Sequence, residues 1–220
     1  LSFLFVSIFV GVLTAPTTVA AQTETNDETN DSTGKVELYQ LVPDADALMQ
    51  SYVIKTSNGK LIVIDGGTDN NSSNKGYLVP ALRAIAGVND GEYFEVEAWF
   101  ITHSHSDHFS EIAKMLYTYN ENSNYKINNL YFDFPPFDTD EFPYSDGEAS
   151  TTNEFKAGLT NYATVNGISV PEDSTYYDEL NGAVINSESI KNGLVLTVDD
   201  VKFEILMTWK ASRGSDANNQ

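Results

Sequence analysis

All three histidines of this 220-residue chain fall within six consecutive positions, and this concentration is the strongest chemical signal in the sequence. His103, His105, Asp107 and His108 stand at H-x-H-x-D-H spacing directly after an apolar run. Residues two apart on an extended chain point to the same side, so His103 and His105 can offer imidazole nitrogens to one ion. The turn that follows brings Asp107 and His108 around to a second ion. The spacing therefore predicts two adjacent divalent metal ions.

The ligand types narrow the choice of metal. The chain has no cysteine, which excludes disulfides, thiolate zinc sites, cysteine nucleophiles and lipid attachment to a lipoprotein cysteine. Histidine and carboxylate ligands suit zinc, with iron or manganese as alternatives, because affinity alone does not select among these ions. The competing interpretation is a polar loop that holds three histidines by chance. Because every histidine stands at ligand spacing, we prefer the metal site.

Length and charge set limits on the fold and on the partners. With 220 residues, 41% of them hydrophobic, the chain is long enough for one domain with a sizeable core. Thirty-two acidic against 12 basic side chains give a net charge of -20, which disfavours generic binding to nucleic acids or anionic membranes. The chain also lacks Gly-rich phosphate loops and the Gly-x-Ser-x-Gly element. Their absence excludes nucleotide kinases and α/β-hydrolases.

The elements around the histidines can be placed from the hydrophobic pattern. Alternating apolar and polar residues predict an N-terminal β-meander with strands at 35–41, 51–56 and 61–65. Apolar residues at helical spacing predict a helix over 74–88. A buried strand over 95–102 runs straight into the histidines, and a helix over 110–119 is expected behind them. The predicted metal site thus lies at a strand-to-helix junction.

The second half of the chain is predicted to continue the alternation of strands and helices. We expect a strand over 128–134, a loop over 138–150 and a helix over 153–165. Two further strands, 193–198 and 201–209, are joined by Asp199-Asp200, a two-residue hairpin signal.

The N-terminus has the composition of an export signal. Residues 1–13 form an apolar run shorter than the ~20 residues of a membrane-spanning helix, and small residues lead to Ala21. We predict a signal peptide over 1–21, with an uncleaved anchor as the alternative, and a mature chain that begins near Gln22. The polar, acidic residues 22–34 are predicted to be a disordered linker. The mature protein is then secreted or otherwise extracytoplasmic, including the cell surface, with no stable membrane insertion.

The motif resembles the signature of the metallo-β-lactamase-fold hydrolases, whose H-x-H-x-D-H stands here as His103, His105, Asp107 and His108. The V-I-D-G-G segment at 63–67 is similar to that family's strand-ending Asp-Gly-Gly. The resemblance spans 35–220 and points in particular to the exported bacterial group related to the competence-protein hydrolase domain. It implies an α/β fold, an αββα sandwich of two face-to-face sheets with helices outside. It also implies that Asp65 supports the metal loop from behind the ligands rather than binding metal.

The chain departs from the family pattern in its later ligands. That family supplies further histidines and a bridging aspartate, whereas no histidine follows His108 here. The polar residues 212–220 are typical of a loop that leads to another strand. We therefore expect an N-terminal part of the domain, incomplete at its C-terminus, that contains half of the ligands; the alternative is a member that has lost the others.

The resemblance implies a metal-dependent hydrolase. Two divalent ions would activate water for attack on an ester, thioester, lactam or phosphodiester bond, and Asp107 would be both a ligand and the catalytic residue that orients this water. The fold does not name the substrate, because one scaffold serves many reactions. The first alternative is a non-catalytic metal-binding or interaction domain with an incomplete site. The second is a surface adhesion module.

Overall fold

The central element is a mixed sheet of six strands. The computed structural model describes residues 5–9, 34–41, 50–68, 76–132, 146–168 and 192–207. The strands of this sheet are β2 (Glu37–Gln40), β3 (Tyr52–Lys55), β4 (Leu61–Ile64), β5 (Phe94–Ile101), β6 (Tyr125–Ile127) and β7 (Leu130–Phe132). The first three form the predicted antiparallel meander, and β4 pairs with β5 in parallel. Both β6 and β7 pair in parallel with β5, which makes β5 the centre of the sheet.

A second, three-stranded sheet packs against one face of the first. Its order is β1 (Phe5–Phe9), β9 (Val201–Met207) and β8 (Val195–Val198), all antiparallel. Side chains from both sheets share a buried apolar cluster: Ile54, Ile62, Ile64, Ala98, Phe100, Tyr131, Leu194, Val201, Phe203 and Ile205. The ring of Phe100 lies 4.9 Å from those of both Tyr131 and Phe203. The two sheets therefore face each other, as the sandwich prediction requires.

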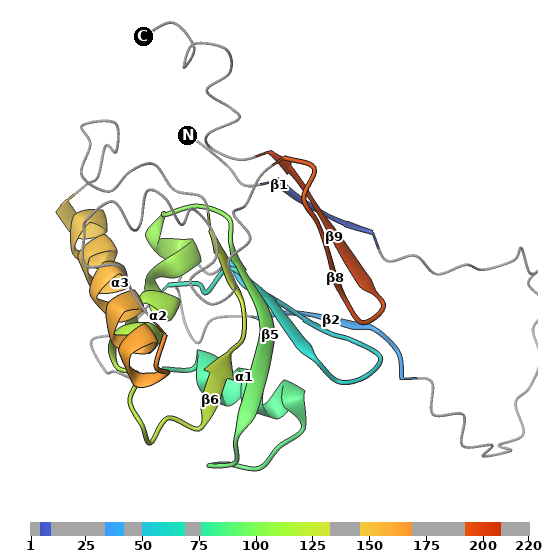
Figure 1. Ribbon diagram of the computed structural model, residues 1–220, viewed down its shortest axis with the longest axis horizontal. Helices are drawn as coiled ribbons and strands as arrows, with labels where there is room; N and C mark the ends of the chain where they lie inside the picture. The colour runs from blue at the N-terminus through green and yellow to red at the C-terminus, as the bar shows by residue number, and fades with distance from the viewer. Residues whose placement is uncertain are drawn as a thin grey trace, which may run out of the picture.

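Helices cover the opposite face of the main sheet (Figure 1). They are α1 (Leu78–Ala86), α2 (Ser106–Tyr117) and α3 (Asp146–Val165). All three contribute to a second core cluster with strands β3 to β7, and among the described residues none contributes to the layer between the sheets. The α/β class is thus confirmed, and the described residues supply one helical layer and both sheet layers of the predicted sandwich.

Helices α2 and α3 pack unusually closely. A Cβ added at Gly158 of α3 would lie 2.7 Å from the backbone nitrogen of Tyr117, so only glycine fits there. One turn later, the Asn161 amide donates to the carbonyl oxygens of Leu116 at 3.1 Å and Tyr119 at 2.6 Å. Leu116 lies in the last turn of α2, where backbone acceptors have no partner within the helix, and Tyr119 follows two residues after the helix ends. The α3 side chain thus caps α2.

The start of α2 differs from the prediction of a helix over 110–119. The helix begins at Ser106, so Asp107 and His108 lie in its first turn rather than in a loop before it. The apolar pattern that marks a helix begins only at Phe109, whereas the polar first turn shows no such pattern. An acidic residue in the first turn is favourable there because it faces the positive end of the helix dipole.

The strand predicted over 128–134 corresponds to the shorter β7, Leu130–Phe132, and residues 133 and 134 lie outside the described residues; a further short strand, β6, precedes it at Tyr125–Ile127. The chain bends at Asn128 and Asn129, and the Asn129 amide donates to the carbonyl of Glu97 at 2.7 Å. Strand β6, which the sequence did not suggest, is held to α3 because the Tyr162 hydroxyl contacts both the backbone nitrogen and oxygen of Ile127 at 2.8 and 3.0 Å.

Helix α3 also differs from its predicted bounds of 153–165. It begins at Asp146, seven residues earlier, so the end of the loop predicted over 138–150 is helical. Residues 138–145 lie outside the described residues.

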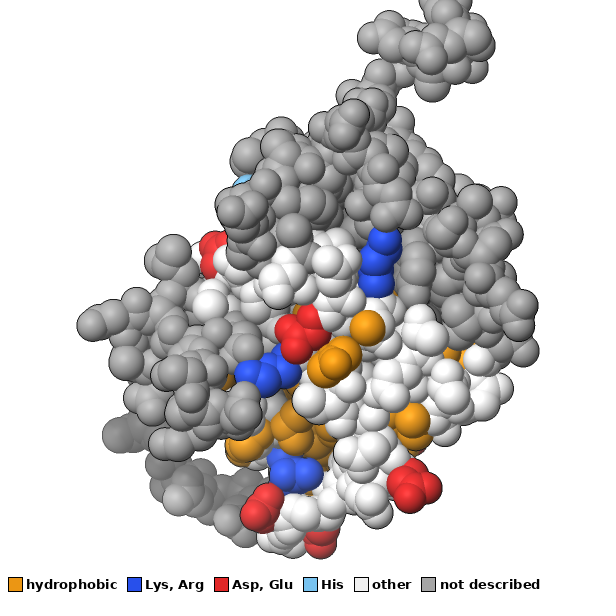
Figure 2. Space-filling view, turned by 90° about the vertical axis from the view of Figure 1, so that its left-hand side faces the viewer, with side chains coloured by type: hydrophobic (Ala, Val, Ile, Leu, Met, Phe, Trp, Pro, Cys, Tyr) orange, Lys and Arg blue, Asp and Glu red, His pale blue; other side chains and the backbone are white. Residues whose placement is uncertain are grey.

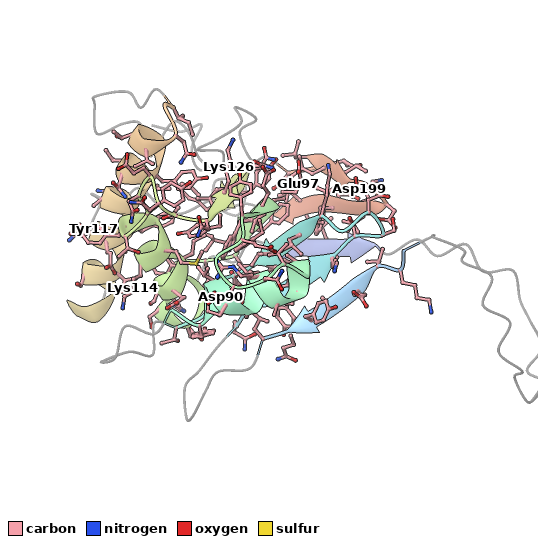
Figure 3. All side chains as sticks on the ribbon, turned by 90° about the horizontal axis from the view of Figure 1, so that it is seen from below. Asp90, Glu97, Lys114, Tyr117, Lys126 and Asp199 are labelled. Atoms are coloured by element: carbon pink, nitrogen blue, oxygen red, sulfur yellow. The ribbon has the colours of Figure 1, made fainter. Side chains whose placement is uncertain are left out.

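The Asp199-Asp200 hairpin is confirmed between β8 and β9, with Asp199 in the left-handed region at φ 51°. Its carboxylate accepts a hydrogen bond of 2.6 Å from Thr56 at the end of β3. Lys60 lies within 3.7 Å of Asp199 and 3.6 Å of Glu97, which stand at the same end of the molecule in Figure 3. The turn therefore also ties the second sheet to the first.

Part of the N-terminal region is described. Strand β1 lies within the residues predicted to be an export signal and pairs with β9. The signal itself and its cleavage stay predictions. Of the predicted linker over 22–34, the structure describes only Gly34. Of the domain predicted over 35–220, it describes the ranges given above. No helix in the described ranges has the length and apolar character needed to cross a bilayer.

Candidate metal centre

The predicted site forms where two parallel strands end. β4 and β5 pair in parallel with Ile64 opposite Phe100, so the residues that follow them meet at one edge of the sheet. Asp65 follows β4 directly, and residues 102–105 connect β5 to α2. Edges of this kind are common locations for ligand sites in sheets with parallel strands.

Asp65 occupies the base of the site. Its backbone adopts a left-handed conformation, φ 61°, and the residue is 4% exposed. The carboxylate accepts hydrogen bonds from the Thr102 backbone nitrogen at 2.7 Å and from the Thr102 hydroxyl at 2.9 Å, and it lies 2.8 Å from Nδ1 of His108. Burial raises the pKa of Asp65, and the contact with His108 opposes that rise. The carboxylate thus faces the back of a predicted ligand, as expected of a supporting residue.

The two glycines after Asp65 allow α2 to approach. The backbone nitrogens of Gly66 and Gly67 donate to the His108 carbonyl, the latter at 3.2 Å. A Cβ at Gly66 would meet the Ile112 side chain at 3.0 Å and its backbone nitrogen at 3.1 Å. Asp-Gly-Gly therefore fixes the first turns of α2 against the end of β4, which gives the sequence signal a physical cause.

Asp107 and His108 are positioned by the first turn of α2. His105 is the N-cap residue, with extended backbone angles of φ -80° and ψ 146°. The Asp107 carbonyl accepts a hydrogen bond from the Gln50 backbone nitrogen at 3.0 Å, and its carboxylate Oδ2 lies 3.6 Å from Nε2 of His108. The half-buried Asp107 side chain thus lies on the Nε2 side of His108, opposite Asp65.

The three imidazoles lie against one another. The ring of His103 is 3.7 Å from that of His108 and 4.7 Å from that of His105, measured between centroids. Burial, followed by the neighbouring His108 and His105, lowers the pKa of His103 to about 4. His103 is therefore neutral near pH 7, which is the form that can bind a metal ion.

The donor set fits a divalent ion in its chemistry. It comprises three imidazoles and one carboxylate around a partly buried edge, with a second carboxylate behind one imidazole. However, no three His, Asp or Glu side chains among the described residues converge on one point that an ion could occupy. The predicted ligands His103, His105, Asp107 and His108 are thus brought together, but as neighbours rather than as a closed coordination shell.

Two residues of the site were not predicted. Thr102 contacts Asp65 and lies 3.1 Å from Nδ1 of His103 and 3.4 Å from Nδ1 of His108. Thr102 directly precedes the histidine motif and carries a hydroxyl, so its position in the sequence could have indicated that it contacts a metal ligand. Gln50 contributes only a backbone nitrogen from a distant segment, and nothing in the sequence indicates such a contact.

Comparison with known proteins agrees with this geometry. The family model described as the metallo-beta-lactamase superfamily matches residues 50–178, more than half of the chain. The chain therefore belongs to the metallo-beta-lactamase superfamily, which confirms the resemblance seen in the motif and the fold class. No curated protein matches the chain.

Proposed function

We propose that this protein is an exported metal-dependent hydrolase that acts on an ester, thioester, lactam or phosphodiester bond. One observation supports the proposal above others: three imidazoles and the Asp107 carboxylate lie together at the end of β5, with the buried Asp65 behind His108. Superfamily membership adds the hydrolase-like fold and the expectation of divalent metal, most often zinc.

Each residue has a distinct part in this proposal. His103 and His105 would hold a first ion, and Asp107 and His108 a second. When bound, the ions supply a Lewis acid that polarises the scissile bond and acidifies water. Asp65 orients the His108 ring through Nδ1, and the burial of His103 keeps its imidazole unprotonated near pH 7. Asp107, on the first turn of α2, offers the carboxylate best placed to orient an attacking water.

Charge favours a small substrate over a nucleic acid. The chain carries a net charge of -20, and the basic side chains on the face drawn in Figure 2 lie apart from one another among acidic and apolar ones. A polyanion needs a continuous basic surface to offset its own repulsion. Extracytoplasmic location rests on the apolar residues 1–13 and the small residues before Gln22.

A second candidate function is metal binding without catalysis. It is favoured by the incomplete convergence of donors among the described residues. Such a domain would bind at most one ion weakly, because a half-site leaves the ion short of the four ligands that zinc prefers.

Metal content and turnover separate the two candidates. The full-length mature protein, loaded with zinc and dialysed, should hold about two ions per chain and hydrolyse a member of a lactam, thioester, lactone and phosphodiester panel. Turnover should stop with a chelator and return with zinc. Weak binding of at most one ion with no chelator-sensitive turnover would support the non-catalytic candidate, and no metal binding would contradict both.

A further inference from the structure

Thr102 stands where the polar groups behind the histidines meet. Its hydroxyl lies 2.9 Å from each carboxylate oxygen of Asp65 and 3.1 Å from Nδ1 of His103. Its backbone nitrogen donates to the same carboxylate at 2.7 Å. Thr102 therefore contacts the supporting carboxylate and a predicted metal ligand at once, although it cannot itself be a strong ligand.

The number of protons available restricts how this network is arranged. A hydroxyl has one proton to donate and two lone pairs that accept, whereas an ionised carboxylate only accepts. When the Thr102 hydroxyl donates to Asp65, it can only accept from His103, so Nδ1 of His103 must bear the proton. The same carboxylate, 2.8 Å from Nδ1 of His108, requires a proton on that nitrogen too.

We infer that Thr102, together with Asp65, holds His103 and His108 as Nδ1–H tautomers and so leaves the Nε2 lone pair of each ring for metal. The hydrogen bond at one imidazole nitrogen decides which nitrogen is free to bind. Thr102 is thus a positioning residue. As a statement about metal ligation, this inference rests on the proposed function.

His105 provides an internal comparison. Its ring packs edge-on against His103, and within the described residues no hydrogen bond to its ring nitrogens is found. An imidazole without an anchor in water favours the Nε2–H tautomer. His103 and His108 should therefore differ from His105 in the protein without metal.

The test reads the tautomers directly, in the full chain treated with chelator. Protein labelled with ¹⁵N in its histidines is studied by long-range ¹H–¹⁵N correlation, above the ordinary imidazole pKa of about 6.5. Three variants accompany it. Thr102→Val removes the hydroxyl while keeping the shape, and Thr102→Ser keeps the hydroxyl. Thr56→Val removes a buried, hydrogen-bonded hydroxyl at the end of β3, in contact with the β8–β9 turn, and is the matched control.

We expect Nδ1–H signals for His103 and His108 in the unmodified protein and in the Thr102→Ser and Thr56→Val variants. In Thr102→Val, His103 should shift to the Nε2–H form, whereas His108 keeps its proton because Asp65 remains. Zinc affinity, measured by competition with a chromogenic chelator, should fall roughly 10-fold in Thr102→Val only.

Two results would overturn the inference: an Nε2–H His103 in the unmodified protein, or an unchanged His103 in a folded Thr102→Val variant. If Thr102→Val does not fold, the unmodified protein alone still tests the inference, because its His103 is predicted to be the Nδ1–H tautomer. The outcome is separable from that of the proposed function. If the protein shows Nδ1–H tautomers but binds no zinc, the tautomer inference holds and the proposed function is contradicted. If it binds zinc but shows Nε2–H tautomers, the tautomer inference is wrong and metal binding is supported.

Discussion

The Asp65 carboxylate lies 2.8 Å from Nδ1 of His108, across 43 residues of sequence. This contact joins the end of β4 to the first turn of α2 and places a buried charge directly behind a predicted metal ligand. The His108 carbonyl receives the Gly66 and Gly67 nitrogens from the same segment. Ligand orientation and helix position therefore depend on one short stretch of chain.

Replacing Asp65 by Asn should weaken metal binding by about 10-fold or more. The amide would present a donor to the Thr102 backbone N–H or to His108 Nδ1, so one buried hydrogen bond is lost and the His108 ring loses its fixed orientation. Competition with a chromogenic chelator measures the zinc affinity, and thermal melting measures the stability lost with the hydrogen bond. Asp90→Asn is the control, because the Asp90 side chain is fully exposed and its ion pair with Arg83 lies at the surface, away from the histidines. An Asp65→Asn protein with unchanged zinc affinity would show that Asp65 does not orient a ligand.

Replacing Asp107 by Asn should abolish hydrolysis while the fold survives. The substitution removes a half-buried negative charge but keeps the volume of the side chain and the backbone carbonyl that accepts from Gln50. Losing one preorganised electrostatic contact in a site typically costs about 10²-fold or more in rate. Rates on any substrate whose turnover is chelator-sensitive are compared with the unmodified protein at equal melting temperature. Equal rates would exclude Asp107 from the working site.

The metal-free protein should become less stable on acidification because of His103. Burial lowers the pKa of His103 from 6.5 to about 4, so between these values the unfolded chain takes up a proton that the folded protein does not. The free energy of unfolding then falls as the pH drops, by up to about 2 kcal/mol between about pH 6.5 and 5 for this group. The raised pKa of Asp65 acts in the opposite direction, since protonation of the folded state there offsets part of the loss.

The free energy of unfolding of the metal-free protein, prepared with a chelator, is measured by urea unfolding at about pH 6.5 and about pH 5. A His103→Gln variant keeps Asp65, His105 and His108, so the difference in pH dependence between the two proteins belongs to His103. Identical pH dependence in both proteins would contradict the lowered pKa.

Replacing Asn161 by Ala should destabilise the packing of α2 on α3. Its amide donates to the carbonyls of Leu116, at the end of α2, and of Tyr119, just after it, and a hydrogen bond of this kind typically contributes about 1 kcal/mol to stability. Chemical denaturation measures the loss. Asn153→Ala on an exposed position of the same helix is the control and should change the stability little. Equal stability of the two variants would mean that water replaces the cap without cost.

Export predicts a mature N-terminus near Gln22. N-terminal sequencing of protein recovered from outside the cytoplasmic membrane is the direct test. Recovery of residues 1–13 on membrane-bound protein would instead support the uncleaved anchor. Because β1 lies within the predicted signal, cleavage would also remove one of the two strands that pair with β9, leaving β8.

The sequence by itself determined the class of the protein and the place of its candidate site. Periodicity located β2 to β5 to within about two residues, since each strand alternates or is fully apolar and ends at a glycine or polar turn. The H-x-H-x-D-H spacing and Asp-Gly-Gly marked the ends of two strands. Both signals are local in the chain, so they can be recognised without knowledge of the three-dimensional contacts.

Tertiary structure decided the rest, because it depends on contacts between distant segments. Strand β6 is stabilised by Tyr162, which is 35 residues away, and its three residues are too few to show a period. The polar first turn of α2 is fixed by backbone donors from Gln50, Gly66 and Gly67, which hydrophobic patterning does not report. Thr102 acquires its position only when the parallel pairing of β4 with β5 brings it to Asp65. Side-chain types name the chemistry available to a site, whereas the hydrogen bonds that orient those side chains exist only once the sheet has formed.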